Sequence, residues 1–282
     1  MRVRDNWIYF GRGVAAVAVV AGCFVANEAK AELIYGVSDQ LNQLVSFDSA
    51  SPGTLVSAHN ISGLQGNEQL RGVDWIDGTL FGLGDGSHLY IVNPNTAAVT
   101  LVGSGAFSPA LNGIDFGFNS GTSQLYVSSD LGQNLTINPV TGVATPGPSY
   151  TPGSSLDALA YDYVSGNFYA ISAASHNLFS VNPATGTMSL VGPTGVAFQD
   201  RVGFDISPNT GTAYFSATVG GQTEFYTVNK GTGALTLVGA IGNPGELSSG
   251  LDSIAVVNVP EPSALAFLTL GGLLFGVFMR QK

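Results

Sequence analysis

The chain has 282 residues, of which 9 are Lys or Arg and 19 are Asp or Glu, so its formal net charge is −10. This scarcity of positive charge argues against nucleic-acid binding, which needs clustered Lys and Arg to neutralise phosphates. A coiled coil is also excluded, because Ala, Glu, Lys, Leu and Arg do not dominate the composition. The mean hydropathy of +0.27 combines two apolar ends with a more polar middle.

The first 31 residues have the pattern of a secretory signal peptide. Arg2, Arg4 and Arg12 precede an apolar run over 14–26, and Ala29-Lys30-Ala31 follows as an A-x-A site. We expect cleavage between Ala31 and Glu32, which would leave a mature chain without cysteine. The alternative is a lipoprotein signal, in which Cys23, the only cysteine, carries the lipid.

Residues 32–258 contain one unit repeated five times. The clearest column is an apolar strand that ends in Asp or Asn, commonly followed by Pro, and these ends are spaced 44 to 47 residues apart. This period is typical of four-stranded propeller blades. The marker residues are Asp48, Asn93, Asn138, Asn182 and Asn229.

Each unit also contains an opening strand, and the placement of these strands predicts the fold. We expect opening strands at 72–75, 113–116, 158–161, 203–206 and 253–256. The first unit lacks one at its start, while the last opening strand has no unit after it. An all-β, five-bladed β-propeller resolves both facts, because the C-terminal strand completes the N-terminal blade. A linear solenoid is the alternative, and it leaves the last strand unexplained.

The sequence offers candidate binding residues but no enzyme motif. One position at the start of the opening strands should ring one mouth of the central channel, and it reads Arg71, Asn112, Asp157, Val202 and Asp252; the polar members form a candidate ligand site. A polysaccharide hydrolase or lyase is an alternative, and it would require Asp157 and Asp252 as paired carboxylates. We expect no cofactor and no metal site.

A second group of acids, Asp74, Asp115 and Asp205, lies inside the predicted opening strands. Asp157 and Asp252 lie just before other copies of that strand, and the polar ring to which they belong could bind a cation or a small ligand at the channel mouth. The interpretation that we favour is structural: short acidic side chains accept hydrogen bonds from backbone amides of neighbouring strands.

The five long connections between units are expected on the face opposite the chain's ends. They span 60–71, 104–112, 147–157, 192–202 and 239–252 and are rich in Gly, Pro and Ser. Loops of this kind carry recognition residues in many folds. We therefore expect Phe107, Tyr150 and Phe198 to contact a partner or glycan there.

The last 24 residues have the pattern of a sorting signal. A Pro-Glu-Pro motif precedes a 16-residue apolar run at 264–279, and Arg280 and Lys282 close the chain. The run is short for a membrane span but long enough to insert, with the basic tip in the cytoplasm. An ordinary tail anchor is the alternative. The motif residues are Val259, Pro260, Glu261, Pro262 and Ser263.

This C-terminal order resembles the PEP-CTERM sorting signal of Gram-negative bacteria. The resemblance implies processing by an exosortase and an association with extracellular polysaccharide and biofilm. The middle, on 113–116, 124–126, 130–139 and 141–142, resembles an uncharacterised family of exported bacterial repeat proteins for which no catalytic residues are assigned.

Together these patterns predict an exported, transiently tethered propeller that binds extracellular matrix components. Exopolysaccharide, a neutral glycan or a surface protein are the expected partners. A passive structural surface protein is the remaining alternative. Residues 32–258 contain 16 acidic and three basic residues, a net charge of about −13 that repels anionic polymers.

Overall fold

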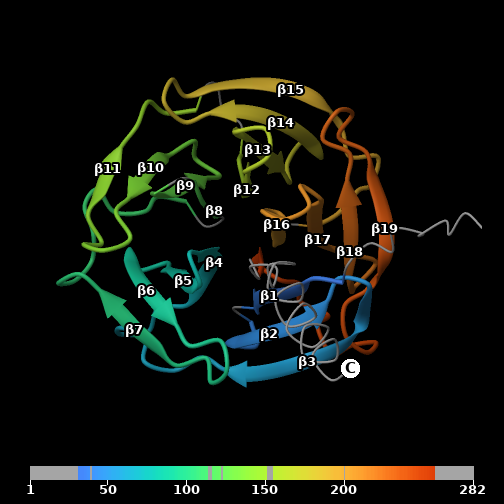
Figure 1. Ribbon diagram of the computed structural model, residues 1–282, viewed down its shortest axis with the longest axis horizontal. Coiled ribbons are helices and arrows are strands. Elements are labelled where there is room, and N and C mark those ends of the chain that lie inside the picture. Colours follow the sequence, from blue (N-terminus) through green and yellow to red (C-terminus); the bar gives the residue numbers. More distant parts are fainter. Residues whose placement is uncertain are drawn as a thin grey trace, which may run out of the picture. The chain divides into compact units, whose positions relative to one another are not determined.

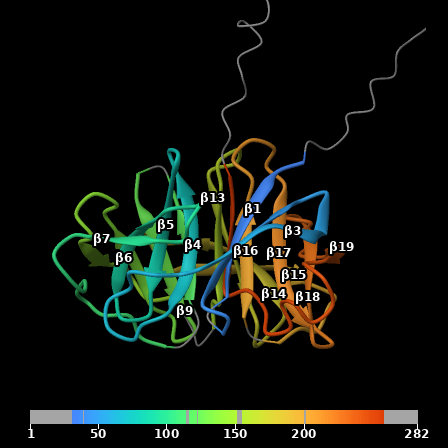
Figure 2. The same cartoon turned by 90° about the horizontal axis from the view of Figure 1, so that it is seen from below.

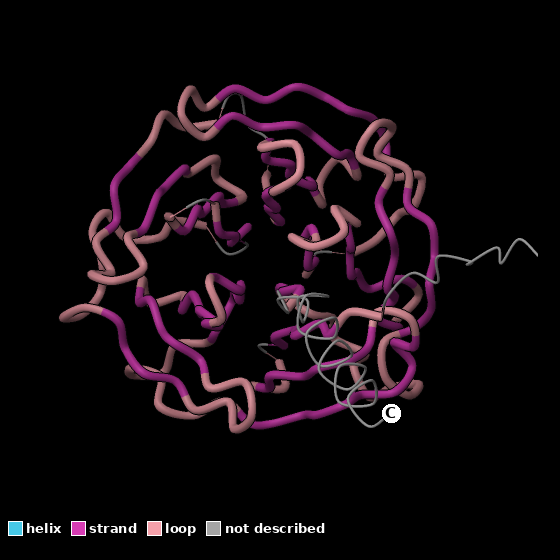
Figure 3. Tube along the Cα trace, in the orientation of Figure 1, coloured by secondary structure: helices cyan, strands magenta, loops and turns pink. Residues whose placement is uncertain are grey.

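The computed structural model describes residues 31–38, 40–113, 116–121, 123–150, 155–199 and 201–257. In these ranges the chain forms twenty β-strands in five four-stranded antiparallel sheets. The sheets stand as blades around a common axis (Figure 1), and short loops join successive strands (Figure 3). The predicted five-bladed β-propeller is confirmed.

The blades follow one another in chain order, and each runs from an inner strand at the axis to an outer strand. Blade 1 holds β20 (Ser253–Val256), β1 (Leu33–Ser38), β2 (Gln43–Asp48) and β3 (Ser51–Asn60). Blade 2 holds β4 (Leu70–Ile76), β5 (Thr79–Gly84), β6 (His88–Val92) and β7 (Val99–Val102). Blade 3 holds β8 (Phe116–Ser120), β9 (Leu125–Ser129), β10 (Asn134–Ile137) and β11 (Ala144–Pro146). Blade 4 holds β12 (Ala158–Asp162), β13 (Asn167–Ser172), β14 (Asn177–Asn182) and β15 (Thr187–Pro193). Blade 5 holds β16 (Val202–Ile206), β17 (Ala213–Val219), β18 (Gln222–Val228) and β19 (Leu235–Ala240).

The ring closes through the last strand of the fold. β20 pairs antiparallel with β1, and Ile34 lies opposite Val256. Flanking backbone bonds extend this pairing, from Asp252 N to Val37 O at 2.8 Å and from Val257 N to Leu33 O at 3.0 Å. This pairing confirms the predicted circular closure and excludes a linear solenoid.

Each blade buries both of its faces, so the apolar core is divided into five clusters between neighbouring blades. Among the described residues, the clusters between blades 4 and 5, 1 and 2, 2 and 3, and 5 and 1 contain 14, 13, 12 and 10 buried residues. The cluster between blades 3 and 4 contains six. In the described part of the chain, the junction between blades 3 and 4 therefore has the fewest buried apolar side chains.

The third opening strand differs from its prediction at 113–116. β8 spans Phe116–Ser120, and Asn119 lies opposite Tyr126 as Asp74 lies opposite Phe81 in blade 2. A second glycine-aromatic pair, Gly117-Phe118, therefore takes the place predicted for Gly113-Ile114. Gly117 is required there because a Cβ would lie 2.8 Å from the backbone nitrogen of Leu159 in blade 4.

The two sides of the ring differ in the loops that they carry. The long connections from each outer strand to the next inner strand lie on one side, here named the connection face. β1 begins and β20 ends on the opposite side, the terminal face, where Val257 bonds Leu33 (Figure 2). The two faces are therefore arranged as predicted.

Candidate functional site

Both arginines of residues 32–258 meet at one carboxylate on the connection face. Arg71 Nη1 lies 3.2 Å from Asp252 Oδ1, and Arg201 Nη1 lies 3.0 Å from the same oxygen. The three residues come from blades 2, 5 and 1. We name these residues, together with Asp85 and Gln69, the arginine cluster.

Arg71 is directed into this cluster by the backbone of β4. The pairing with β5 shifts register between Leu70 and Gly72, so Arg71 is the extra residue of a bulge. Its Nε lies 3.5 Å from Asp85 Oδ2, and its Nη2 donates to Gln69 Oε1 at 3.4 Å. Two carboxylates thus compensate the two guanidinium charges, and the cluster is close to neutral.

Arg201 reaches Asp252 from a left-handed backbone conformation, with φ of 69°. Such a conformation costs about 1 kcal/mol or more for a residue with a side chain, and it is retained where surrounding contacts impose it. Gly250, itself at φ of 89°, packs here, and a Cβ on it would lie 3.2 Å from the Arg201 Cβ. Sequence reasoning missed Arg201 because the residue of blade 5 that was aligned with Arg71 in the repeat is Val202, the next residue along the chain. The sequence did contain a signal for this residue, because Arg201 is one of only two arginines in residues 32–258.

A polar pocket of about 580 Å³ adjoins Arg201. The Thr218 hydroxyl is buried in its wall and has no hydrogen-bond partner among the described residues. Amide, hydroxyl and guanidinium groups dominate the lining, and Arg201 is its one charged lining residue in the described part of the chain. Such a surface suits a ligand with many hydroxyl groups. The lining residues are Gln40, Gln199, Arg201, Thr218, Ser248 and Ser249.

The other two predicted ring residues make contacts close to their own blades. Asp157 accepts a short hydrogen bond from the Ser155 hydroxyl and another from Ala173 N at 2.6 Å. Asn112 precedes β8, and its side-chain oxygen accepts from Ser129 Oγ at 3.0 Å. The position equivalent to Arg71 in blade 3 is therefore Phe116, because the opening strand begins later than predicted.

The three aromatic residues predicted to face a partner are buried. Phe107, Tyr150 and Phe198 are 6%, 4% and 8% exposed, and each belongs to a cluster between two blades. Their position in the long connections was predicted correctly, but the expectation of an exposed aromatic surface is corrected. Burying these large apolar rings anchors the connections onto the core.

At the opposite end of the inner strands, polar side chains bond to the backbone of the next blade. Asn119 accepts from Tyr161 N at 2.9 Å, and Asp205 accepts from Val256 N at 2.6 Å. Asp74 accepts in the same way from Ser120 N. The structural interpretation of Asp74 and Asp205 is confirmed, while Asp115 lies outside the described residues.

Burial controls the ionisation of these two acids. Desolvation, followed by the charge of Asp205, raises the pKa of Asp74 well above its ordinary value. Desolvation likewise raises the pKa of Asp205 to about 6, against the hydrogen bonds from Val256, Asn119 and Ile206, which lower it. The inner strands thus carry ionisable groups that titrate above the usual carboxylate range.

The predicted processing sites lie at or beyond the edges of the described fold. Ala31 is exposed, whereas Glu32 is buried: its backbone nitrogen donates to Ser49 Oγ at 2.9 Å, and its carboxylate accepts from Tyr214 at 2.9 Å. Residues 1–30, the motif at 259–263 and the apolar run at 264–279 lie outside the described residues. Within the described ranges, no helix has the length and apolar character needed to cross a bilayer.

Comparisons with known proteins identify similar structures of low identity. A structural genomics protein of unknown function from Bacteroides thetaiotaomicron matches 72% of this chain at 14% identity, with a TM-score of 0.47, and the match covers 56% of that protein. A chain of a nidogen/laminin complex matches 79% of this chain at 10% identity and a TM-score of 0.47, over 84% of its own length. No curated protein matches the sequence. The model of a domain of unknown function, DUF4394, matches residues 43–251, and the chain therefore belongs to the DUF4394 family.

Proposed function

We propose that this protein is an exported propeller that binds a hydroxyl-rich component of the extracellular matrix on its connection face. The observation that carries the proposal is the arginine cluster, in which both arginines of the domain share Asp252 beside a polar pocket. Arginine is well suited to this task, because its five N–H donors are fixed in a planar fork.

The charge distribution favours a neutral ligand. The domain carries a net charge of about −13, which repels acidic polymers, while the arginine cluster is itself nearly compensated by Asp252 and Asp85. A neutral polysaccharide meets both conditions, because its hydroxyl groups accept from guanidinium and amide donors. The proposal is therefore binding, without a chemical step.

Export and temporary tethering are supported by the sequence patterns at 1–31 and 259–282. The resemblance to the PEP-CTERM signal implies an exosortase-type enzyme as the processing partner. Because Leu33 and Val257 meet on the terminal face, a tether attached after Val257 leaves the connection face turned away from it. A ligand site on the connection face would then be accessible at the cell surface.

The binding proposal is tested with the purified domain, residues 32–258. Isothermal titration with dextran as a neutral polysaccharide and polygalacturonate as an acidic one should show binding of dextran. The double variant Arg201→Gly and Thr218→Val should weaken that binding at least tenfold, because it removes the guanidinium and the buried hydroxyl. Glycine also relaxes the left-handed backbone at position 201.

Lys230→Ala is the matched control, because Lys230 is the remaining basic residue and pairs with Asp162 on another part of the ring. It should leave dextran binding within twofold of the unmodified domain. Equal affinities of the double variant and this control would contradict the proposal. Fractionation of cells that express the chain with and without 259–282 tests the tether separately.

A further inference from the structure

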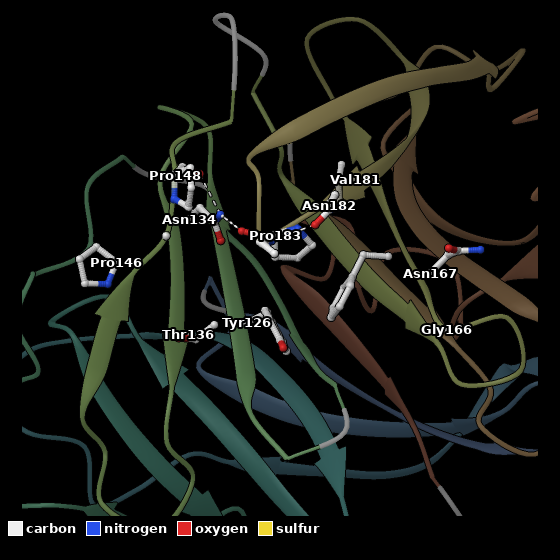
Figure 4. Close-up of a pocket in the computed structure, with 13 residues that line it drawn as sticks. Tyr126, Asn134, Thr136, Pro146, Pro148, Gly166, Asn167, Val181, Asn182 and Pro183 are labelled. Atoms are coloured by element: carbon white, nitrogen blue, oxygen red, sulfur yellow. Dashed lines mark hydrogen bonds between the residues drawn. The ribbon is translucent and has the colours of Figure 1, made fainter.

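A second pocket, of about 520 Å³, lies at the junction between blades 3 and 4. Blade 3 contributes Tyr126, Asn134 and Thr136 to one side, and blade 4 contributes Asn167 and Val181 to the other (Figure 4). The volume lies within the range of small-molecule sites. Further lining comes from Pro146, Gly147, Pro148, Gly166, Phe168, Asn182, Pro183 and Ala184.

A side chain joins the two blades at this junction, whereas backbone bonds join three of the other junctions. Backbone hydrogen bonds join the outer parts of blades 1 and 2, 4 and 5, and 5 and 1, for example from Val99 N to Ser62 O at 2.8 Å. Between blades 3 and 4 the Asn134 amide forms the bridge, donating to Pro148 O at 2.9 Å and to Pro183 O at 2.7 Å. The Asn134 side chain, and not a backbone bond, therefore connects the two blades at one wall of the pocket.

Two further features of the junction increase the space. The outer strand β11 has three residues and ends at Pro146, and the chain then passes through Gly147-Pro148. Proline lacks the N–H that would continue a sheet, so this segment does not extend toward blade 4 as a strand. The apolar cluster beneath is also the smallest of the five.

The chemistry of the lining is that of a neutral, amphipathic site. Of the described residues that line it, none is Lys, Arg, Asp or Glu, in a domain with 16 acidic side chains. Tyr126 and Phe168 lie with their ring centroids 4.5 Å apart and supply an apolar aromatic surface. Asn167 and Asn182 also line the pocket; Asn167 Nδ2 donates to Ser165 Oγ at 3.2 Å, and the Asn182 side-chain oxygen accepts from Ala184 N at 3.0 Å.

A buried hydroxyl lies next to this aromatic surface. Tyr150 is 4% exposed, packs in the same cluster as Phe168, and its hydroxyl has no hydrogen-bond partner among the described residues. Burial raises the pKa of this hydroxyl, and the charge of Tyr126 raises it further. A buried polar group without a partner is unusual in proteins, and a bound ligand or water would satisfy it.

We propose that this inter-blade pocket binds one or two rings of a neutral saccharide, as a site separate from the arginine cluster. The apolar C–H face of a pyranose would pack on Tyr126 and Phe168, while its hydroxyl groups would meet the amides of Asn167 and Asn182. The pocket disfavours a sugar that carries a carboxylate or a sulfate, because no Lys or Arg lines its described part. The inference goes beyond the proposed function and does not depend on it.

The experiment uses neutral hexaoses built from glucose, mannose or galactose as probes, with hexagalacturonate and decaproline as alternatives, in isothermal titration. At least one neutral hexaose should bind. Ala184→Trp, which places a bulky ring at the pocket rim, should weaken that binding at least tenfold. Val140→Trp is the matched control, because Val140 holds the same position in the Asn-Pro-x-Thr-Gly turn of blade 3, is 83% exposed and does not line the pocket.

A second pair of variants covers the case in which tryptophan disturbs folding. Asn182→Ala and Asn138→Ala each remove an equivalent turn hydrogen bond, to Ala184 N at 3.0 Å and to Val140 N at 2.9 Å, but Asn182 alone lines the pocket. Only Asn182→Ala should reduce hexaose affinity. The arginine-cluster variant should retain this binding, which separates the two sites. Absence of binding by every hexaose, equal effects within both pairs, or decaproline binding lost in Ala184→Trp would each overturn the proposal.

Discussion

The two ends of the inner strands use polar side chains in opposite ways. On the connection face, Arg71 and Arg201 both pair with the buried Asp252 and remain partly exposed themselves, with 27% of the Arg201 side chain accessible. Toward the terminal face, Asp74, Asn119 and Asp205 are buried and bond to the backbone of the next blade. Three of the five inner strands therefore carry a structural polar group toward the terminal face, whereas the arginine cluster on the connection face pairs side chains with one another.

The largest effect is expected from removing a structural acceptor. Asp205→Ala leaves the N–H groups of Val256 and Ile206 and the amide of Asn119 without their buried partner. Each such loss costs about 1–3 kcal/mol, and these costs are not additive, so we expect about 3 kcal/mol of lost stability. Urea unfolding at pH 7 measures this loss.

Blades 4 and 1 have no polar side chain at the position equivalent to Asp205. Ala160 and Ala255 occupy the place of Asp205 there, so a blade tolerates a missing acceptor where the chain has adapted to it. Ala160→Gly serves as the matched control and should cost about 1 kcal/mol or less. A loss below about 0.5 kcal/mol for Asp205→Ala would show that water replaces the carboxylate and that this end of the strands is not a structural element.

A smaller effect is expected at the arginine cluster. Asp252→Ala removes the carboxylate that two guanidinium groups share, and solvent screens both partly exposed arginines, so we expect about 2 kcal/mol or less. Added salt should reduce the difference between the variant and the unmodified domain. A loss equal to that of Asp205→Ala, unchanged by salt, would remove the distinction between the two ends.

The smallest effect is a dependence of stability on pH. The folded pKa of Asp205 is about 6 and that of Asp74 is also raised, whereas an unfolded Asp titrates near 3.9. The folded state thus binds protons more tightly, and stability present below about pH 4 is lost as the pH rises through 6. Unfolding free energy should fall by about 1 kcal/mol between pH 5 and 7.5, and less in Asp205→Ala. A rise over this interval would contradict the assignment.

The fold was predictable from the repeat, whereas much of the site was not. Five similar units and an unpaired opening strand at 253–256 were sufficient to predict a closed ring. The register of the opening strand in blade 3 was not predictable in this way, because Gly113 and Gly117 both begin a plausible opening strand. Burial of Phe107 and Phe198 depends on how the connections fold back, which local pattern does not encode.

The two pockets were not visible in the sequence for a related reason. Arg201 joins Asp252 through an unusual backbone conformation one residue away from the repeat column. The inter-blade pocket depends on Asn134, which begins a marker strand like its counterparts in other blades but bridges two carbonyl groups. In both cases a residue that lines the pocket departs from the pattern of the repeat.

The burial of Glu32 bears on when the predicted cleavage after Ala31 would take place. A peptidase requires an extended, accessible segment on both sides of the bond that it cuts, yet Glu32 is held by Ser49 of blade 1 and Tyr214 of blade 5. If the leader is removed after Ala31, as the sequence predicts, removal precedes closure of the ring. Folding after such a cleavage would place the new amino terminus in the seam between the first and last blades, where Glu32 is buried.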